Sequence, residues 1–186
     1  MLVIILLFFG LAMDSGIVMM EKGASIKDLD IRKTIKYPLI FAVTNIVFLL
    51  GGYLFSKVLS NIVDNKFLID LAMIILFCEG VLFLHRALFY KGFEEKLDRQ
   101  FNDHKCIALA CLTSLDTLCA GICLGLLRSH LYRMMIISFI TIFFVTMLGL
   151  RCGYSYGAKY QKIFEFIEGA CIILFAILTF LGVSRW

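Results

Sequence analysis

The sequence has little charge, almost no proline and no Gly/Ser-rich linker. Of its 186 residues, 17% are charged and one is proline, whereas 61% are hydrophobic. The apolar share of a soluble domain is usually just under half, so this composition excludes an ordinary soluble protein. The apolar residues form blocks of about 20, the length that crosses the roughly 30 Å hydrocarbon core of a bilayer. The sequence therefore predicts an integral membrane protein.

Motifs of enzymes and nucleotide-driven pumps are also missing from the sequence. It has no GxxxxGK[ST] P-loop, which argues against direct use of ATP, and no HExxH or GxSxG motif. The seven cysteines are odd in number and include no CxxC pair, so a disulfide framework is not indicated. A net charge of +4 is explained by the loops and indicates no nucleic-acid partner. We expect a membrane protein that is not an enzyme and carries no cofactor.

Six apolar blocks are candidate membrane spans. All should be helical, because a span in lipid must satisfy its own backbone hydrogen bonds. The first block has no positive n-region and is too long for a signal peptide, so we expect it to be retained. The predicted spans cover residues 2–20, 37–56, 67–89, 106–127, 132–154 and 163–183.

Lys and Arg are distributed unevenly between the two sides of a six-span arrangement. Thirteen of the 18 lie in segments 21–36, 84–105 and 151–162, and five lie in the termini and the other turns. Cytoplasmic loops carry the excess of Lys and Arg. We therefore expect these three segments in the cytoplasm and both termini outside.

Short matches between the two halves of the chain indicate an internal repeat. AMDS resembles SLDT, which aligns Asp14 with Asp116, and CEG resembles IEG, which aligns Glu79 with Glu168. The second and fifth spans both end in a glycine-bearing stretch, LLGGY and MLGLRCGY. Each half would then contain three spans.

Because three is odd, the second half should enter the membrane from the opposite side, as in the inverted repeats of secondary transporters. In such folds the substrate site lies near the bilayer midplane, where the repeats meet. The fold prediction is an all-α integral membrane domain over residues 1–186, with six helices in two inverted three-helix repeats. The first repeat covers about 1–90, a cytoplasmic loop about 91–105, and the second repeat about 106–186.

Four acidic residues lie well inside apolar spans: Asp14, Glu79, Asp116 and Glu168. A carboxylate at mid-span costs about 2.5–3.5 kcal/mol on insertion scales, and no Lys or Arg lies near the centre of any span. The acids are therefore either protonated or share a cation. For Glu79 and Glu168, a neutral carboxyl that bonds a neighbouring helix is an equally good interpretation.

Oxygen-bearing side chains near the two aspartates complete a candidate metal site. Asn45 supplies an amide in the second span. Carboxylates with further oxygen ligands suit Mg²⁺, Ca²⁺ or Mn²⁺ and disfavour soft ions. The hydroxyl groups expected to support the site are those of Ser15, Thr44, Thr113, Ser114, Thr117 and Thr146.

The two cysteines that follow Asp116 are either metal ligands or packing residues. Cys119 and Cys123 follow it on the same helix face and are possible soft ligands for Zn²⁺ or Cd²⁺, although such cysteines more commonly serve packing.

Small residues four apart let helix backbones approach closely. This pattern predicts helix-packing roles for Gly121, Gly125, Gly149 and Gly153.

The stretches LAMDSGIVMMEKGAS and TSLDTLCAGICLGLL resemble the MntP family of bacterial manganese efflux pumps. That family has six helices in two three-helix repeats, each opening on an Asp-bearing helix. The resemblance covers nearly the whole chain, including LIF at 39–41, Gly52, Gly149 and the EG pairs. The chain departs from the family pattern where Asn45 replaces a Glu, and where Glu79 and Glu168 replace glycines of GG pairs.

The resemblance implies Mn²⁺ export across the bacterial cytoplasmic membrane, with Asp14 and Asp116 as key acidic positions. The expected partners are a divalent cation as transported substrate, protons as a coupling ion, and the lipid bilayer. Two alternatives stay open at this point. The chain could belong to a related branch of non-transporting sporulation or assembly proteins, or it could export a softer ion such as Zn²⁺ or Cd²⁺.

Overall fold

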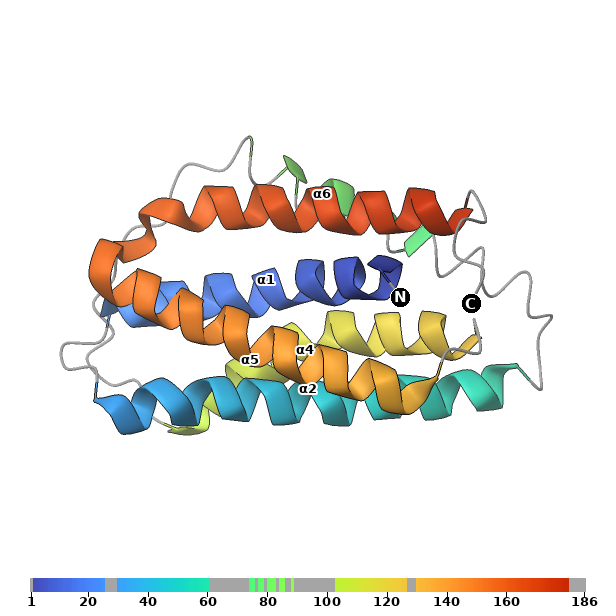
Figure 1. The fold of residues 1–186 in the computed structure, drawn as a ribbon, viewed down its shortest axis with the longest axis horizontal. Coiled ribbons are helices and arrows are strands. Elements are labelled where there is room, and N and C mark those ends of the chain that lie inside the picture. The colour runs from blue at the N-terminus through green and yellow to red at the C-terminus, as the bar shows by residue number, and fades with distance from the viewer. Residues whose placement is uncertain are drawn as a thin grey trace.

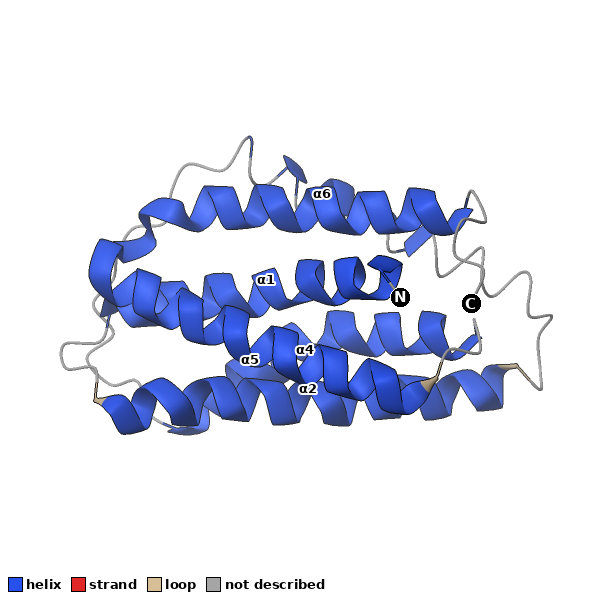
Figure 2. Cartoon of the chain, viewed as in Figure 1, coloured by secondary structure: helices blue, strands red, loops and turns tan. Residues whose placement is uncertain are grey.

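The computed structural model describes residues 2–25, 30–60, 103–126 and 130–180, and ten residues between 74 and 88. All regular elements in these residues are helical (Figure 2). The ten residues between 74 and 88 are helical as well. The prediction of an all-α protein is confirmed. The elements are α1 (Leu2–Ser25), α2 (Ile31–Leu59), α4 (Asp103–Leu126), α5 (Leu131–Tyr156), the short 3₁₀ helix η1 (Gly157–Tyr160) and α6 (Gln161–Phe180).

The helices match the predicted spans in position and are longer at several ends. Within the part of the chain that the structure describes, α1, α2, α4 and α5 are long and apolar enough to cross a membrane. The α2 helix begins at Ile31 and includes Arg32 and Lys33, since a helix can continue beyond the hydrocarbon layer into water. Most of the predicted span 67–89 lies outside the described residues.

The helices form a bundle along one long axis (Figure 1). The α1 and α5 helices run in one direction, and α2, α4 and α6 run in the opposite direction. The most extensive contacts of α1 are with α5 and then with α6, whereas those of α2 are with α4 and then with α5. The first two helices of the chain are thus packed mainly against helices from its second half.

Glycines make the two most extensive helix contacts possible. A Cβ atom at Gly52 of α2 would overlap the carbonyl oxygen of Leu118 in α4, and one at Gly149 of α5 would overlap the carbonyl oxygen of Gly16 in α1. Because these backbones touch directly, a side chain at either glycine would force the helices apart.

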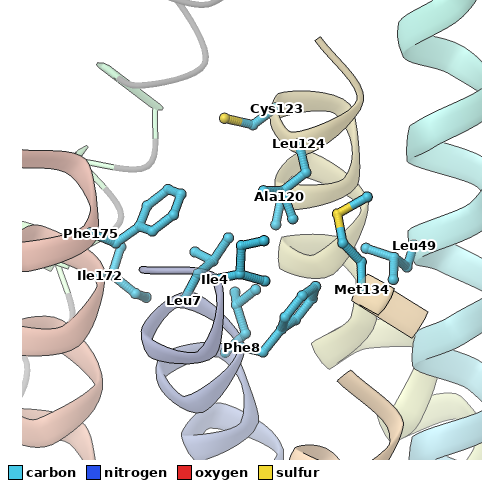
Figure 3. Packing of buried hydrophobic residues seen from close by; sticks show 11 residues of the cluster. Ile4, Leu7, Phe8, Leu49, Ala120, Cys123, Leu124, Met134, Ile172 and Phe175 are labelled. Atoms are coloured by element: carbon cyan, nitrogen blue, oxygen red, sulfur yellow. The ribbon is translucent and has the colours of Figure 1, made fainter. Parts of the chain in front are cut away.

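Buried apolar side chains from five helices meet in a cluster at one end of the bundle (Figure 3). Phe8 of α1, Phe175 of α6 and Met134 of α5 are all fully buried in it. A second cluster lies along α1 and includes Met19, Phe41 of α2 and further residues of α4 and α5. Together the two clusters bury the inward faces of the helices.

The outer faces of the bundle are apolar too. Val47 and Leu54 of α2 are each 59% exposed, and Phe144 and Leu148 of α5 are each 58% exposed. Surfaces of this kind suit contact with lipid chains, which satisfy apolar side chains without burying them in protein. The exposed pattern therefore agrees with a membrane-spanning bundle.

The basic residues of the described helices gather at one end of the bundle. This is the end where α1 and α5 terminate and α2, α4 and α6 begin. The opposite end carries Lys57 and Arg133. The described basic residues at the basic end are Lys22, Arg32, Lys33, Lys36, Lys105, Arg151 and Lys162.

Candidate functional site

The acidic residues predicted inside spans lie near the middle of their helices. Asp14 and Asp116 are half-buried in α1 and α4, and Glu168 is fully buried in α6. Glu79 lies outside the described residues. Asn45 likewise lies near the middle of α2.

One face of α1 lies against α6, and Asp14 is on that face. Gly10 contacts Ile172 of α6, and Glu21 accepts a hydrogen bond from Gln161 at the start of α6. Residues four and seven apart share a helix face, so Asp14 lies on the same face as Gly10 and Glu21.

The α6 side of this interface carries Glu168. Its backbone carbonyl oxygen lies 3.6 Å from where a Cβ of Gly10 would be, one helical turn from Asp14. Both Asp14 and Glu168 were predicted members of one metal site, and their helices pack against each other within one turn of both residues.

A polar bridge at the basic end of this interface was missed in the sequence analysis. The side-chain Nε2 of Gln161 donates to Glu21 Oε1 over 3.1 Å and to Glu165 Oε1 over 3.0 Å. The bridge joins the end of α1 to the start of α6. Glu21 and Gln161 are 140 positions apart, so no local pattern in the sequence indicates the contact.

Asn45 lies at the centre of a hydrogen-bonded chain that crosses three helices. Its Nδ2 donates to Thr117 Oγ1 of α4 over 2.8 Å, and its Oδ1 accepts from Ser138 Oγ of α5 over 3.3 Å. All three residues are at most 1% exposed. Sequence reasoning named Asn45 and Thr117 but missed Ser138, a single serine in an apolar stretch with no acidic neighbour.

Three of the predicted supporting hydroxyls bond to their own helix. Thr113 and Ser114 donate to the carbonyl of Ala110, and Thr146 donates to the carbonyl of Ile142. Such bonds satisfy the hydrogen of a buried hydroxyl and leave its oxygen lone pairs as acceptors. The oxygen atoms of these three hydroxyls can therefore still bind a cation. Thr44 is half-buried on α2.

Ser15, directly after Asp14, differs from these hydroxyls. It is 1% exposed, and its Oγ has no hydrogen-bond partner among the described residues. A buried hydroxyl without a partner is unusual in a native structure and commonly marks a place where water or an ion binds.

The cysteines near Asp116 lie in different surroundings. Cys123 is fully buried among apolar residues of the cluster in Figure 3, beside Leu124 and Ala120. Cys119 is half-buried on the same helix. Among the described residues, no three His, Cys, Asp or Glu side chains are grouped closely enough to hold a metal ion by themselves. A cation held by the described residues alone would need amide, hydroxyl or water oxygens in addition to carboxylates.

The predicted packing glycines lie at helix contacts. Gly121 approaches the backbone of Leu49, and Gly125 approaches the side chain of Ser56, both on α2. Gly149 and Gly153 approach the α1 backbone at Gly16 and Met20. These contacts hold α4 against α2 and α5 against α1, and so position the aspartate-bearing helices.

Comparison with known proteins identifies the family. Residues 28–180 match the model of the Mntp family, described as "Putative manganese efflux pump". The chain belongs to the MntP family. As a family of efflux pumps, it comprises transporters and not enzymes. This agrees with the resemblance drawn from the two aspartate-bearing stretches.

Members of the MntP family from several organisms align over most of the chain. A protein named "Putative manganese efflux pump MntP" from Crocosphaera subtropica is 31% identical over 89% of this chain and 87% of its own length. Proteins of the same name from Rippkaea orientalis and Methanobrevibacter smithii are 30% and 27% identical, covering 90% and 96% of this chain and 88% and 96% of their own. No solved structure matches the chain.

Proposed function

We propose that this protein is a secondary transporter that exports divalent cations, with Mn²⁺ as its ion, across the cytoplasmic membrane. The observation that carries the proposal is the set of buried and half-buried carboxyl, amide and hydroxyl groups near the middle of the helices, in a chain of an efflux-pump family. Asp14 and Asp116 supply the charge that binds the cation. Asn45 and the neighbouring hydroxyls complete an oxygen-rich environment, and Glu168 adds a carboxyl from α6.

The chemistry of the layer supports a hard or borderline cation. Carboxylate, amide and hydroxyl oxygens suit Mn²⁺ better than soft ions. Cys123 lies among apolar side chains, which favours a packing role for its thiol over a soft-metal site. The relatives named above are described as manganese efflux pumps, which supports the same ion.

The packing of the bundle supports two inverted repeats that move against each other. The α1–α5 contact at Gly16 and Gly149 corresponds to the α4–α2 contact at Leu118 and Gly52. Residues 16 and 118 are 102 positions apart, as are Asp14 and Asp116. Because α1 and α4 run in opposite directions, the rotation that relates the two halves reverses the orientation of the second half relative to the first. Rocking of one half against the other would expose a central site to each side in turn.

The charge of the two bundle ends supports the orientation expected from the sequence. The basic end would face the cytoplasm, which leaves both termini outside. Export of a divalent cation against its gradient needs an energy source. Inward proton movement suits this site, because a carboxylate that releases a metal can take up a proton.

The direct test is manganese tolerance in a bacterial host that lacks its own exporter. Expression of the wild-type chain should restore growth in high Mn²⁺ and lower intracellular Mn, and Asp14→Asn or Asp116→Asn should abolish both effects at equal expression. These variants keep the side-chain size and remove the charge. Unchanged growth and Mn content with the wild-type chain would exclude Mn²⁺ export and favour a non-transporting role, and parallel assays with Zn²⁺ and Cd²⁺ test the softer ions.

A further inference from the structure

Two corresponding hydroxyl residues lie directly after the two aspartates. Ser15 follows Asp14 in α1, and Thr117 follows Asp116 in α4. If the two halves of the site were chemically equal, both hydroxyls would have similar surroundings. The structure shows different surroundings for them.

The Thr117 hydroxyl is held by a neighbouring side chain. Its Oγ1 accepts a hydrogen bond from Asn45 Nδ2 over 2.8 Å, and Asn45 Oδ1 in turn accepts from Ser138 over 3.3 Å. This chain is buried and links α4, α2 and α5. One lone pair of Thr117 is therefore occupied, and the position of the side chain is set by a neutral amide.

The Ser15 hydroxyl has no such bond. The described helices contain eight buried serine and threonine residues, and seven of them make a hydrogen bond to a side chain or to their own helix. Ser15 is the eighth, and its Oγ is buried without a partner among the described residues. An unsatisfied hydroxyl in an apolar interior is costly, so its retention beside a carboxylate needs a reason.

The difference between the halves arises from one residue on each facing helix. Asn45 precedes Gly52 by seven positions, and Gly52 contacts the carbonyl of Leu118, the residue after Thr117. Ile142 precedes Gly149 by the same seven positions, and Gly149 contacts the carbonyl of Gly16, the residue after Ser15. Ile142 is therefore the residue of α5 that corresponds to Asn45 of α2. Its side chain has no polar group that could bond the Ser15 hydroxyl.

We propose that the two halves of the site have different tasks, with Ser15 contacting the transported cation and Thr117 serving as a positioning residue. The inference rests on the proposed function, in which both aspartates supply charge, and it assigns the hydroxyl ligand of the cation to the Asp14 side of the site. There, a carboxylate and an open hydroxyl are adjacent in sequence. On the Asp116 side, Ser138, Asn45 and Thr117 hold three helices together.

The assignment makes opposite predictions for two single substitutions. Ser15→Ala removes an oxygen that binds the cation and also removes an unsatisfied polar group. It should weaken Mn²⁺ binding about tenfold or more, while the melting temperature without metal stays equal or rises. Thr117→Val leaves the Asn45 amide without its acceptor. It should lower the metal-free melting temperature and weaken Mn²⁺ binding less than Ser15→Ala does.

Both properties can be measured on the full-length protein in lipid nanodiscs. Free Mn²⁺ is followed by its electron paramagnetic resonance signal during titration, and unfolding is followed by heating without metal. Ser56→Ala is the matched control, since Ser56 is buried and bonded to the Tyr53 carbonyl of its own helix. Ser15→Thr restores a hydroxyl and should recover most of the affinity, because a threonine stands at the corresponding position of the other half.

The outcomes separate this inference from the function on which it rests. If the wild-type protein binds Mn²⁺ and Ser15→Ala binds it equally well, the assignment to Ser15 is wrong and the transporter proposal stands. If the wild-type protein binds no Mn²⁺, both are wrong. If Ser15→Ala does not fold, the variants Ser15→Thr and Ser15→Val, which have the same shape, decide: weaker binding by the valine variant supports the hydroxyl contact, and equal affinity of the two contradicts it.

Discussion

Asn45 of α2 and Thr117 of α4 are joined by a buried hydrogen bond of 2.8 Å. The two residues are 72 positions apart, and Thr117 directly follows one of the two mid-helix aspartates. The bond ties the second helix of one half to the first helix of the other. It lies at mid-bundle, where a transporter of this kind would hold its ion.

Replacement of Asn45 tests how much this bond stabilises the fold. Asn45→Leu removes the amide between Thr117 and Ser138, so two buried hydroxyls lose a partner, and the free energy of unfolding should fall by about 1–3 kcal/mol. Asn45→Asp is the matched variant. Both neighbours are hydroxyls that can donate to a carboxylate, so this variant should be less destabilised in thermal melts. Equal melting of Asn45→Leu and wild type would contradict a stabilising role.

Adjacent glycines in α2 provide a test of helix packing. Gly52→Ala places a Cβ against the Leu118 carbonyl and should destabilise the protein by at least about 1–3 kcal/mol, the usual cost of overpacking. Gly51 has nothing within 4 Å of its Cβ position. Gly51→Ala should therefore be neutral or stabilise the helix by about 0.5–1 kcal/mol. Melting temperatures of the two variants in the same detergent check the prediction, and similar values would refute the close approach of α2 and α4.

The Gln161 bridge should stabilise the junction between α1 and α6. In Gln161→Leu, Glu21 and Glu165 lose a shared donor and face each other without it, so the melting temperature should fall. Gln161→Lys places a positive charge between the two carboxyl groups and should recover the lost stability, more strongly at low salt because screening weakens such pairs. Thermal melts of both variants at two ionic strengths measure these changes in melting temperature. A leucine variant as stable as the glutamine protein would show that the bridge contributes nothing.

The orientation in the membrane can be read from two residues that begin corresponding helices. Asp30 precedes α2 at the basic end, His130 precedes α5 at the other end, and both are exposed. In a variant without native cysteines, His130→Cys should react with a membrane-impermeant maleimide in intact cells. Asp30→Cys should react only after permeabilisation. The reverse pattern would place the termini in the cytoplasm.

Much of the fold was predictable because lipid imposes a simple rule on sequence. Apolar blocks long enough to cross a bilayer must be helical, and the described helices lie where such blocks occur. The positions of Asp14 and Asp116 within their helices followed for the same reason, since a charged residue in an apolar block is visible without any structure. The family also followed from these two stretches, and the family model matches the chain.

The partners of individual side chains were not predictable in this way. Ser138 carries no signal in its own stretch, and it matters because α5 brings it to Asn45. Glu21 and Glu165 lie near span ends and resemble ordinary polar termini, until η1 and α6 fold back and place Gln161 between them. The contacts Asn45–Ser138 and Glu21–Gln161 join residues that are 93 and 140 positions apart, and no local pattern in the sequence indicates them.

The sequence by itself thus determined the class of protein, the helix positions and the acidic residues within the apolar helices, because hydrophobic length and the cost of buried charge are local properties. Only the tertiary structure decided which hydroxyl beside an aspartate has a hydrogen-bond partner, as Thr117 does, and which has none among the described residues, as is the case for Ser15. Thr117 accepts a hydrogen bond from Asn45 of α2, whereas the residue of α5 that corresponds to Asn45 is Ile142, which has no polar side chain. Ser15 and Thr117 look alike in sequence, and the helix packed against each makes them different.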